Sequence, residues 1–122
     1  MLRLLGDNGK PNDNILMHIL SPYAAHRSAL TDCVKLVRTN LGRRHAILIY
    51  GFQSEVWPLE PALRAFEVLA DDLVELGQRH QSEFTELVHN VHRSGCVAGW
   101  EIGRLRRDVQ PSQEQISEFI DR

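Results

Sequence analysis

Long apolar runs are missing from this chain. No stretch approaches the ~20 consecutive apolar residues that a membrane-spanning helix needs. The opening residues, MLRLLGDNGK, also lack the long apolar segment of a signal peptide. Only two cysteines are present, Cys33 and Cys96, and both lie in apolar surroundings, which favours buried free thiols over the alternative of a disulfide bond. We therefore expect a cytoplasmic protein that makes no membrane contact.

The familiar short motifs of catalysis are also missing. The sequence contains no phosphate-binding loop, nucleophile elbow, paired-cysteine metal site or dinucleotide fingerprint. Its composition, 43% apolar and 25% charged, is that of a globular protein rather than a disordered one. A length of 122 residues allows one domain with its own core. Fold class is therefore easier to predict than activity.

The predicted fold is organised around residues 45–52, HAILIYGF. A short uninterrupted run of β-branched and aromatic residues is typical of a strand that is covered on both faces. We predict a single α/β domain over residues 1–122, with a peripheral tail at 104–122 and a mixed sheet whose central strand is 46–51. The other predicted strands are 2–5, 15–20 and 96–102, and the predicted flanking helices lie near 22–41, 60–76 and 79–93.

The most polar stretch is the loop at residues 6–14, GDNGKPNDN. Asn8-Gly9 is a strong hairpin signal, because both residues tolerate a positive φ angle. The loop also holds two carboxylates, at Asp7 and Asp13, which suit a hard divalent cation. A tight turn and a ligand site therefore both remain open.

Two histidines follow this loop. On the predicted elements, His18 lies in the middle of a strand and His26 lies one turn into the next helix, so their rings converge beneath the loop. Asp7, Asp13, His18 and His26 together form a candidate catalytic and metal-binding site for a divalent metal whose identity stays open. The alternative is that both histidines are buried and bonded to backbone carbonyls.

Five arginines form two basic clusters. Phosphate contacts to nucleic acid are one interpretation of these clusters, and ordinary solvated surface is the other. The five are Arg43, Arg44, Arg104, Arg106 and Arg107.

The loop at 51–61, GFQSEVWPLEP, places Trp57 among turn residues, which indicates an exposed apolar contact. A chain of this size with such a loop is expected to form a homodimer.

Several segments carry a resemblance. GDNGKPNDN, LSPYAAHRSALTDC, ILIYGF, WPLEPALRAFE, LVHNVH and WEI are similar to segments of uncharacterised bacterial proteins, over residues 6 to about 103. More distantly, the order hairpin, helix, strand resembles the core of restriction-endonuclease-like nucleases. That resemblance implies a metal-binding acid early in the hairpin, a role open to Asp7 or Asp13. The family's (D/E)-x-K motif is missing, because the corresponding residues 17–20 read MHIL.

Two functional hypotheses follow. The first is a nucleic-acid-acting or metal-dependent hydrolase, active or degenerate, that uses the four site residues above. The second is a non-catalytic, dimeric protein-interaction domain.

Overall fold

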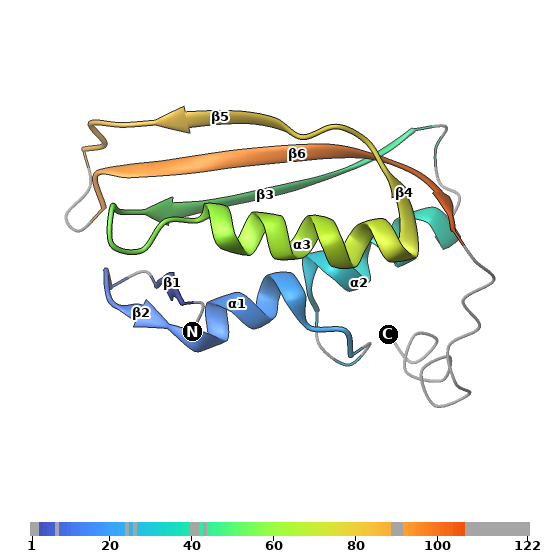
Figure 1. The fold of residues 1–122 in the computed structure, drawn as a ribbon, viewed down its shortest axis with the longest axis horizontal. Coiled ribbons are helices and arrows are strands. Elements are labelled where there is room, and N and C mark those ends of the chain that lie inside the picture. The colour runs from blue at the N-terminus through green and yellow to red at the C-terminus, as the bar shows by residue number, and fades with distance from the viewer. Residues whose placement is uncertain are drawn as a thin grey trace.

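The computed structural model describes residues 3–6, 8–23, 25, 27–39, 42, 44–88 and 92–106, and only the backbone of residues 13 and 14. Helices and strands within these residues confirm the predicted small α/β domain (Figure 1). The elements are β1 (Leu4–Leu5), β2 (Pro11–Asn12), α1 (Asp13–Leu20), α2 (Ala29–Thr39), β3 (His45–Gln53), α3 (Glu60–Leu73), β4 (Val74–Leu76), β5 (His80–Phe84) and β6 (Ser94–Leu105).

The main sheet is built around β6. Strand β3 pairs with one side of β6 from end to end, while β4 and β5 pair in succession with its other side. Every pairing among the described strands is antiparallel, so the prediction of a mixed sheet is wrong. The predicted central strand, 46–51, lies at an edge of the sheet, and β6 takes the central place. Antiparallel strands can be joined by short connections. A run of apolar residues does not show which strands are neighbours, and so does not show which one is central.

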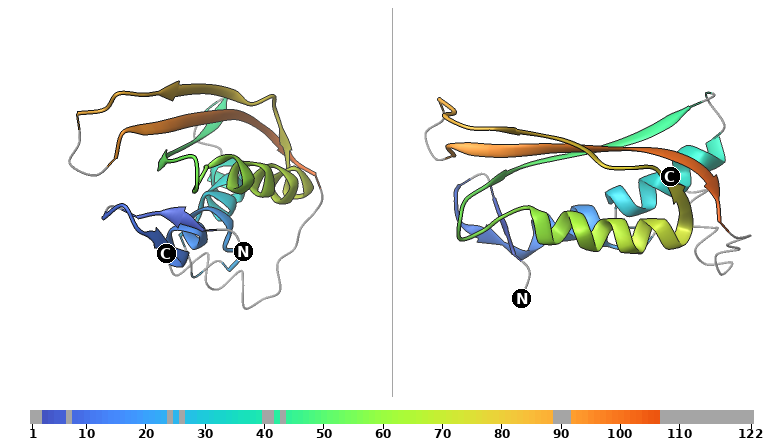
Figure 2. Two further views of the ribbon diagram at one scale, coloured as in Figure 1. Left: turned by 60° about the vertical axis from the view of Figure 1, so that its left-hand side comes forward. Right: turned by 45° about the horizontal axis from the view of Figure 1, so that its top comes forward.

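All three helices lie on one side of this sheet (Figures 1 and 2). The core fills the space between them: Leu63 and Phe66 of α3 and Cys33 of α2 are buried against the inner face of the sheet, which supplies Ile49 and Trp100. The Phe66 and Trp100 rings lie 4.8 Å apart with their planes tilted by 54°, a favourable aromatic geometry. Helix α3 therefore fixes the position of β6.

Residues 15–20 are helical, which corrects the prediction of a strand there. Ile15, Leu16 and Ile19 are buried or half-buried, whereas Met17 and His18 are exposed, and this spacing belongs to one face of α1. A short continuous apolar run is compatible with either a buried strand or a helix, so its periodicity decides nothing. Because α1 packs against α3, the helical form prevails.

The polar loop does turn back at Asn8-Gly9, as predicted, but the hairpin joins β1 to β2 (Pro11–Asn12) rather than to residues 15–20. Gly9 has a φ angle of 79°, and its amide donates to the Gly6 carbonyl at 3.0 Å. In the described residues this hairpin is a two-stranded sheet separate from the main one.

All three predicted flanking helices differ from the structure in their bounds or their form. Helix α2 begins at Ala29 rather than near residue 22, because Ser28 caps it by accepting the Thr31 amide proton at 3.1 Å. Within the predicted helix 79–93, residues 80–84 form strand β5 instead, and residues 74–76, the end of the predicted helix 60–76, form β4. Pairing with β6 overrides the helical spacing of apolar residues in this region.

Candidate functional site

One face of the main sheet has no described helix over it (Figure 2). Strand β3 therefore alternates between buried and exposed residues, where the sequence predicted cover on both faces. Ile47 and Ile49 point into the core, while Leu48 is 68% exposed and Tyr50 is 77% exposed. We call this uncovered side the open face. By strand register it consists of Ala46, Leu48, Tyr50 and Phe52 of β3, Gly95, Val97, Gly99 and Glu101 of β6, and His80, Ser82 and Phe84 of β5.

Glycines of β6 let neighbouring side chains lie flat across the open face. A Cβ atom at Gly99 would come within 2.6 Å of Leu48 Cδ2, and one at Gly95 within 2.5 Å of Phe84 Cε2. Any other residue would push these side chains away from the strand. Leu48 and Phe84 therefore lean over β6 and form part of a shallow apolar surface.

The end of the open face near Phe52 is aromatic. The Phe52 ring stacks in parallel on His92, with centroids 3.9 Å apart and planes within 4°. The His92 side chain is buried. No spacing in the sequence indicates the contact, because it joins β3 to the segment before β6.

The opposite end of the open face is charged. Arg44 binds Glu101 through two hydrogen bonds, of 2.6 and 2.9 Å, and this contact lowers the pKa of the Glu101 carboxyl. Both side chains border a hollow of about 430 Å³ that His80 and Leu48 also line. The hollow is thus lined by both charged and apolar side chains.

Two of the arginines that were predicted to contact nucleic acid are bound to carboxylates in the structure. Arg44 is bound to Glu101, and Arg106 donates to Asp71 at 2.7 Å. Arg104 is exposed on β6, whereas residues 43 and 107 lie outside the described part of the chain. Nucleic-acid binding by this set stays a prediction, and two of its members already neutralise carboxylates.

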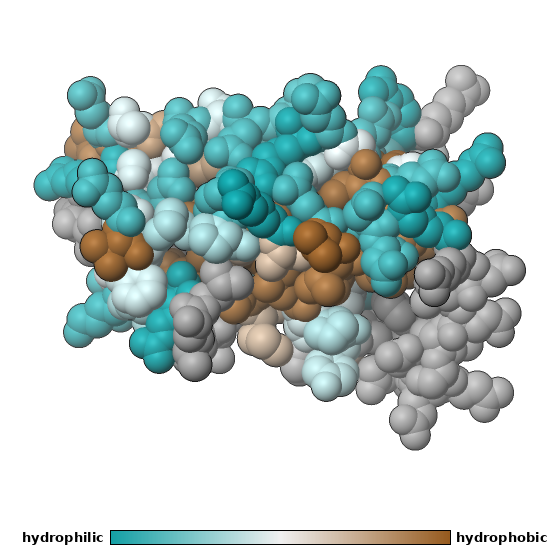
Figure 3. Space-filling view, viewed as in Figure 1, coloured by the Kyte–Doolittle hydropathy of each residue, from teal (hydrophilic) through white to brown (hydrophobic). Residues whose placement is uncertain are grey.

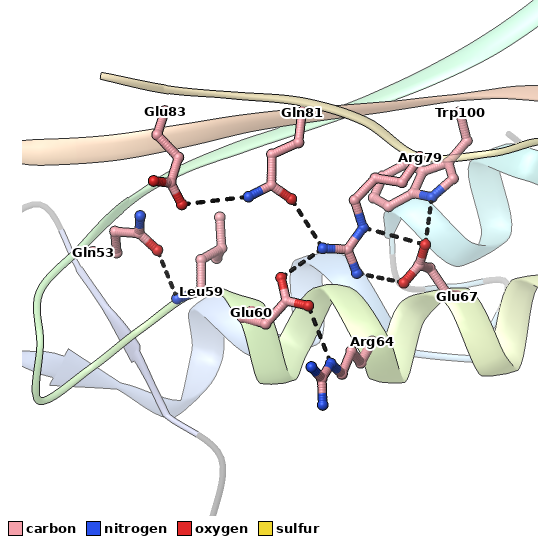
Figure 4. A network of polar contacts seen from close by, with 9 residues as sticks. All are labelled: Gln53, Leu59, Glu60, Arg64, Glu67, Arg79, Gln81, Glu83 and Trp100. Carbon is pink, nitrogen blue, oxygen red and sulfur yellow. Dashed lines mark hydrogen bonds and ion pairs between the residues drawn. The ribbon is translucent and has the colours of Figure 1, made fainter. Parts of the chain in front are cut away.

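A second polar cluster lies between α3 and β5 (Figure 4). Arg79, whose side chain is 16% exposed, donates to Glu60 at 2.5 Å, to Gln81 at 2.9 Å and twice to Glu67. The indole N–H of Trp100 also donates to Glu67, at 2.9 Å. We call these five residues the Arg79 cluster. Sequence reasoning missed it, because its members come from α3, β5, β6 and the segment that joins β4 to β5.

The Arg79 cluster holds its carboxylates charged. Hydrogen bonds from Arg79 lower the pKa of both Glu60 and Glu67, against the opposing effect of burial. The same bonds raise the pKa of Arg79. A general acid needs a raised carboxyl pKa and a free proton path, so this arrangement fits a structural brace rather than acid–base catalysis.

The predicted metal site is only partly described. His18 lies on the last turn of α1 and is exposed, and Asp13 opens the same helix. Asp7 and His26, together with the side chain of Asp13, fall outside the described residues. Within the described ranges, no three His, Cys, Asp or Glu side chains are grouped so as to hold a metal ion. The metal site stays a prediction. Residues 15–20, which that prediction placed in a strand, belong to helix α1 instead.

Both cysteines are free and buried, which confirms the expectation of free thiols. Burial, followed by the charge of Asp32, raises the pKa of Cys33 to about 12, and burial also raises that of Cys96. A thiol that stays protonated is a poor nucleophile. Neither cysteine therefore supports covalent catalysis.

Comparison with known proteins adds no family. No family model matches the chain, and no curated protein and no solved structure matches it either. The resemblances to uncharacterised bacterial proteins and to restriction-endonuclease-like nucleases therefore stay predictions. In the part of the chain that the structure describes, no helix has the length and apolar character to cross a membrane.

Two further apolar groups lie outside the open face. Trp57 is half-buried beside a hollow of about 420 Å³, and its amide donates to Ser54 at 3.1 Å, so the loop turns partly inward. On α3, Val68 is 73% exposed and Leu69 is also exposed. Figure 3, which views the molecule from the side of α3, shows apolar residues near this helix and mostly polar ones over β5.

Proposed function

We propose that this chain is a non-catalytic protein-interaction domain that self-associates through the β3 side of its open face. A single observation carries the proposal: Leu48 and Tyr50, two residues apart on one strand, are 68% and 77% exposed. Large apolar side chains grouped on a surface mark interaction sites more often than single ones do. Aromatic residues such as tyrosine are also enriched where proteins meet.

The absence of charged residues from β3 supports the same surface. Strand β3, HAILIYGFQ, contains no Asp, Glu, Lys or Arg, and the centres of protein interfaces are depleted in charged residues. Removing one such side chain from water contributes about 1.5–3 kcal/mol. Contact between the β3 side chains of two copies removes part of this apolar area from water, which favours association.

The hydrolase hypothesis receives less support from the described residues. Glu60, Glu67 and Glu101 are engaged by arginines, and the two thiols are buried. Of the four predicted site residues, only the His18 side chain is described, and it faces solvent.

Sedimentation velocity tests the proposal. The chain should pass from monomer to dimer as concentration rises through the micromolar range, at which weak specific interfaces dissociate. Tyr50→Lys should raise the dissociation constant about 10- to 100-fold, because it replaces an aromatic contact between the two chains with a charged side chain.

Val68→Lys is the matched control, since Val68 is 73% exposed and lies on α3. It should leave the dimer unchanged. A chain that stays monomeric at all concentrations would refute the proposal, as would an equal loss from Val68→Lys.

A further inference from the structure

We infer that the second copy adds to the outer edge of β3, in antiparallel orientation, so that two chains form one continuous sheet across a two-fold axis. This inference rests on the proposed self-association and specifies its geometry. Antiparallel edges suit such a dimer, because a two-fold axis brings the same strand of each chain into register with itself.

The outer edge of β3 is open. No described strand pairs with it, and the ladder to β6 on its inner side is regular from His45 to Gln53. In an antiparallel ladder, every second residue turns its N–H and C=O groups toward the outer side. Strand β3 thus presents a straight row of donors and acceptors nine residues long, which is a template for another strand.

The two edges of the sheet differ in protection. Proteins guard exposed edges with charges, irregularities and short strands. The β4–β5 edge has all three: Glu75 and Glu83 lie on it, its register shifts between Val74 and Leu76, and its strands have three and five residues. Strand β3 has none of them. Of the two edges, the structure leaves only that of β3 suited to pairing.

The register follows from the alternation of side chains. Residues opposite each other must point to the same face, so open-face positions pair only with open-face positions. Full overlap of 45–53 places Ile49 on the two-fold axis, Leu48 opposite the partner's Tyr50 and Ala46 opposite the partner's Phe52. Such aliphatic–aromatic pairs across strands are favourable.

Edge pairing differs from stacking the two open faces on each other. Tyr50, Val97 and Ser82 form one row across the sheet, as do Leu48, Gly99 and His80. Face-to-face stacking buries the β5 members of these rows, His80 and Ser82, whereas edge pairing at β3 leaves them in water. Substitutions at the two ends of each row therefore separate the two geometries.

The experiment introduces opposite charges at positions that face each other across the two-fold axis, and it measures the dissociation constant of the dimer by sedimentation velocity. Leu48→Glu and Tyr50→Lys, made singly, should each raise the dissociation constant tenfold or more. The double variant should recover most of that loss, because each introduced carboxylate at position 48 then faces an ammonium group at position 50 of the partner. Both native side chains are exposed in the monomer, so melting temperatures should stay close to that of the wild type.

His80→Glu and Ser82→Lys are the matched controls, on the same rows at the opposite edge, and should not change the dissociation constant. Disruption by these controls, or a double variant no better than its single parents, would overturn the edge register and leave self-association standing. A wild-type chain that never dimerises would overturn both the inference and the proposed function.

Discussion

Replacing Trp100 with alanine is expected to lower the free energy of unfolding by about 3–5 kcal/mol, the cost of removing a large aromatic side chain from a packed core. Trp100 is 1% exposed, packs on Phe66 and lies on the central strand β6. Its loss opens a cavity between the sheet and α3, and it also removes a donor to Glu67. Urea unfolding followed by circular dichroism measures the change.

Trp100→Phe is the control that separates the loss of the packed ring from the loss of the hydrogen bond to Glu67. It keeps an aromatic ring beside Phe66 and removes the indole N–H that donates to Glu67, so we expect a smaller cost of about 1–2 kcal/mol. If the alanine variant lost less than about 1 kcal/mol, the described packing of α3 on β6 would be wrong.

Replacing Arg79 with methionine is expected to cost about 2–4 kcal/mol, somewhat below the penalty for breaking a fully buried ion pair. The side chain is 16% exposed and donates to Glu60, Glu67 and Gln81. Methionine fills much of the same volume but leaves two partly buried carboxylates without their cation. The discount reflects the exposure of those carboxylates to solvent.

Arg64→Met serves as the control, since Arg64 forms an ion pair with Glu60 and is largely exposed. It should cost no more than about 0.5 kcal/mol.

The pH dependence of the free energy of unfolding supplies a second test of the Arg79 cluster. Because Arg79 lowers the pKa of Glu67 below its ordinary 4.5, the cluster stabilises the fold above that pH and loses its effect as pH falls further. The difference between wild type and Arg79→Met should therefore shrink below about pH 4.5, and a difference that persists would contradict the cluster.

Sequence reasoning located most segments of regular structure but not their arrangement. The runs at 46–51 and 96–102 are strands, and α3 begins where Pro61 predicts, because β-branched runs and proline-led helix starts are local signals. Which strand is central is a matter of pairing, and pairing is not local. The polar strand β5, HQSEF, carries no strand signal of its own and depends on β6 for its form.

The candidate site was predicted less well, for a physical reason. Leu48 and Tyr50 belong to an apolar run, and the sequence assigns such a run to a buried strand. Their exposure becomes visible only when all described helices are seen on one side of the sheet (Figure 2). An apolar strand at the edge of a sheet and one buried within a sheet have the same sequence pattern.

Amide hydrogen exchange along β3, measured at low and high protein concentration, tests the central claim most directly. Protection of an edge amide rises when its N–H gains a partner strand. We predict that alternate amides of residues 45–53 exchange more slowly at the high concentration, while those of β5 keep one rate. Exchange in β3 that is independent of concentration, or a slowing confined to β5, would contradict the account.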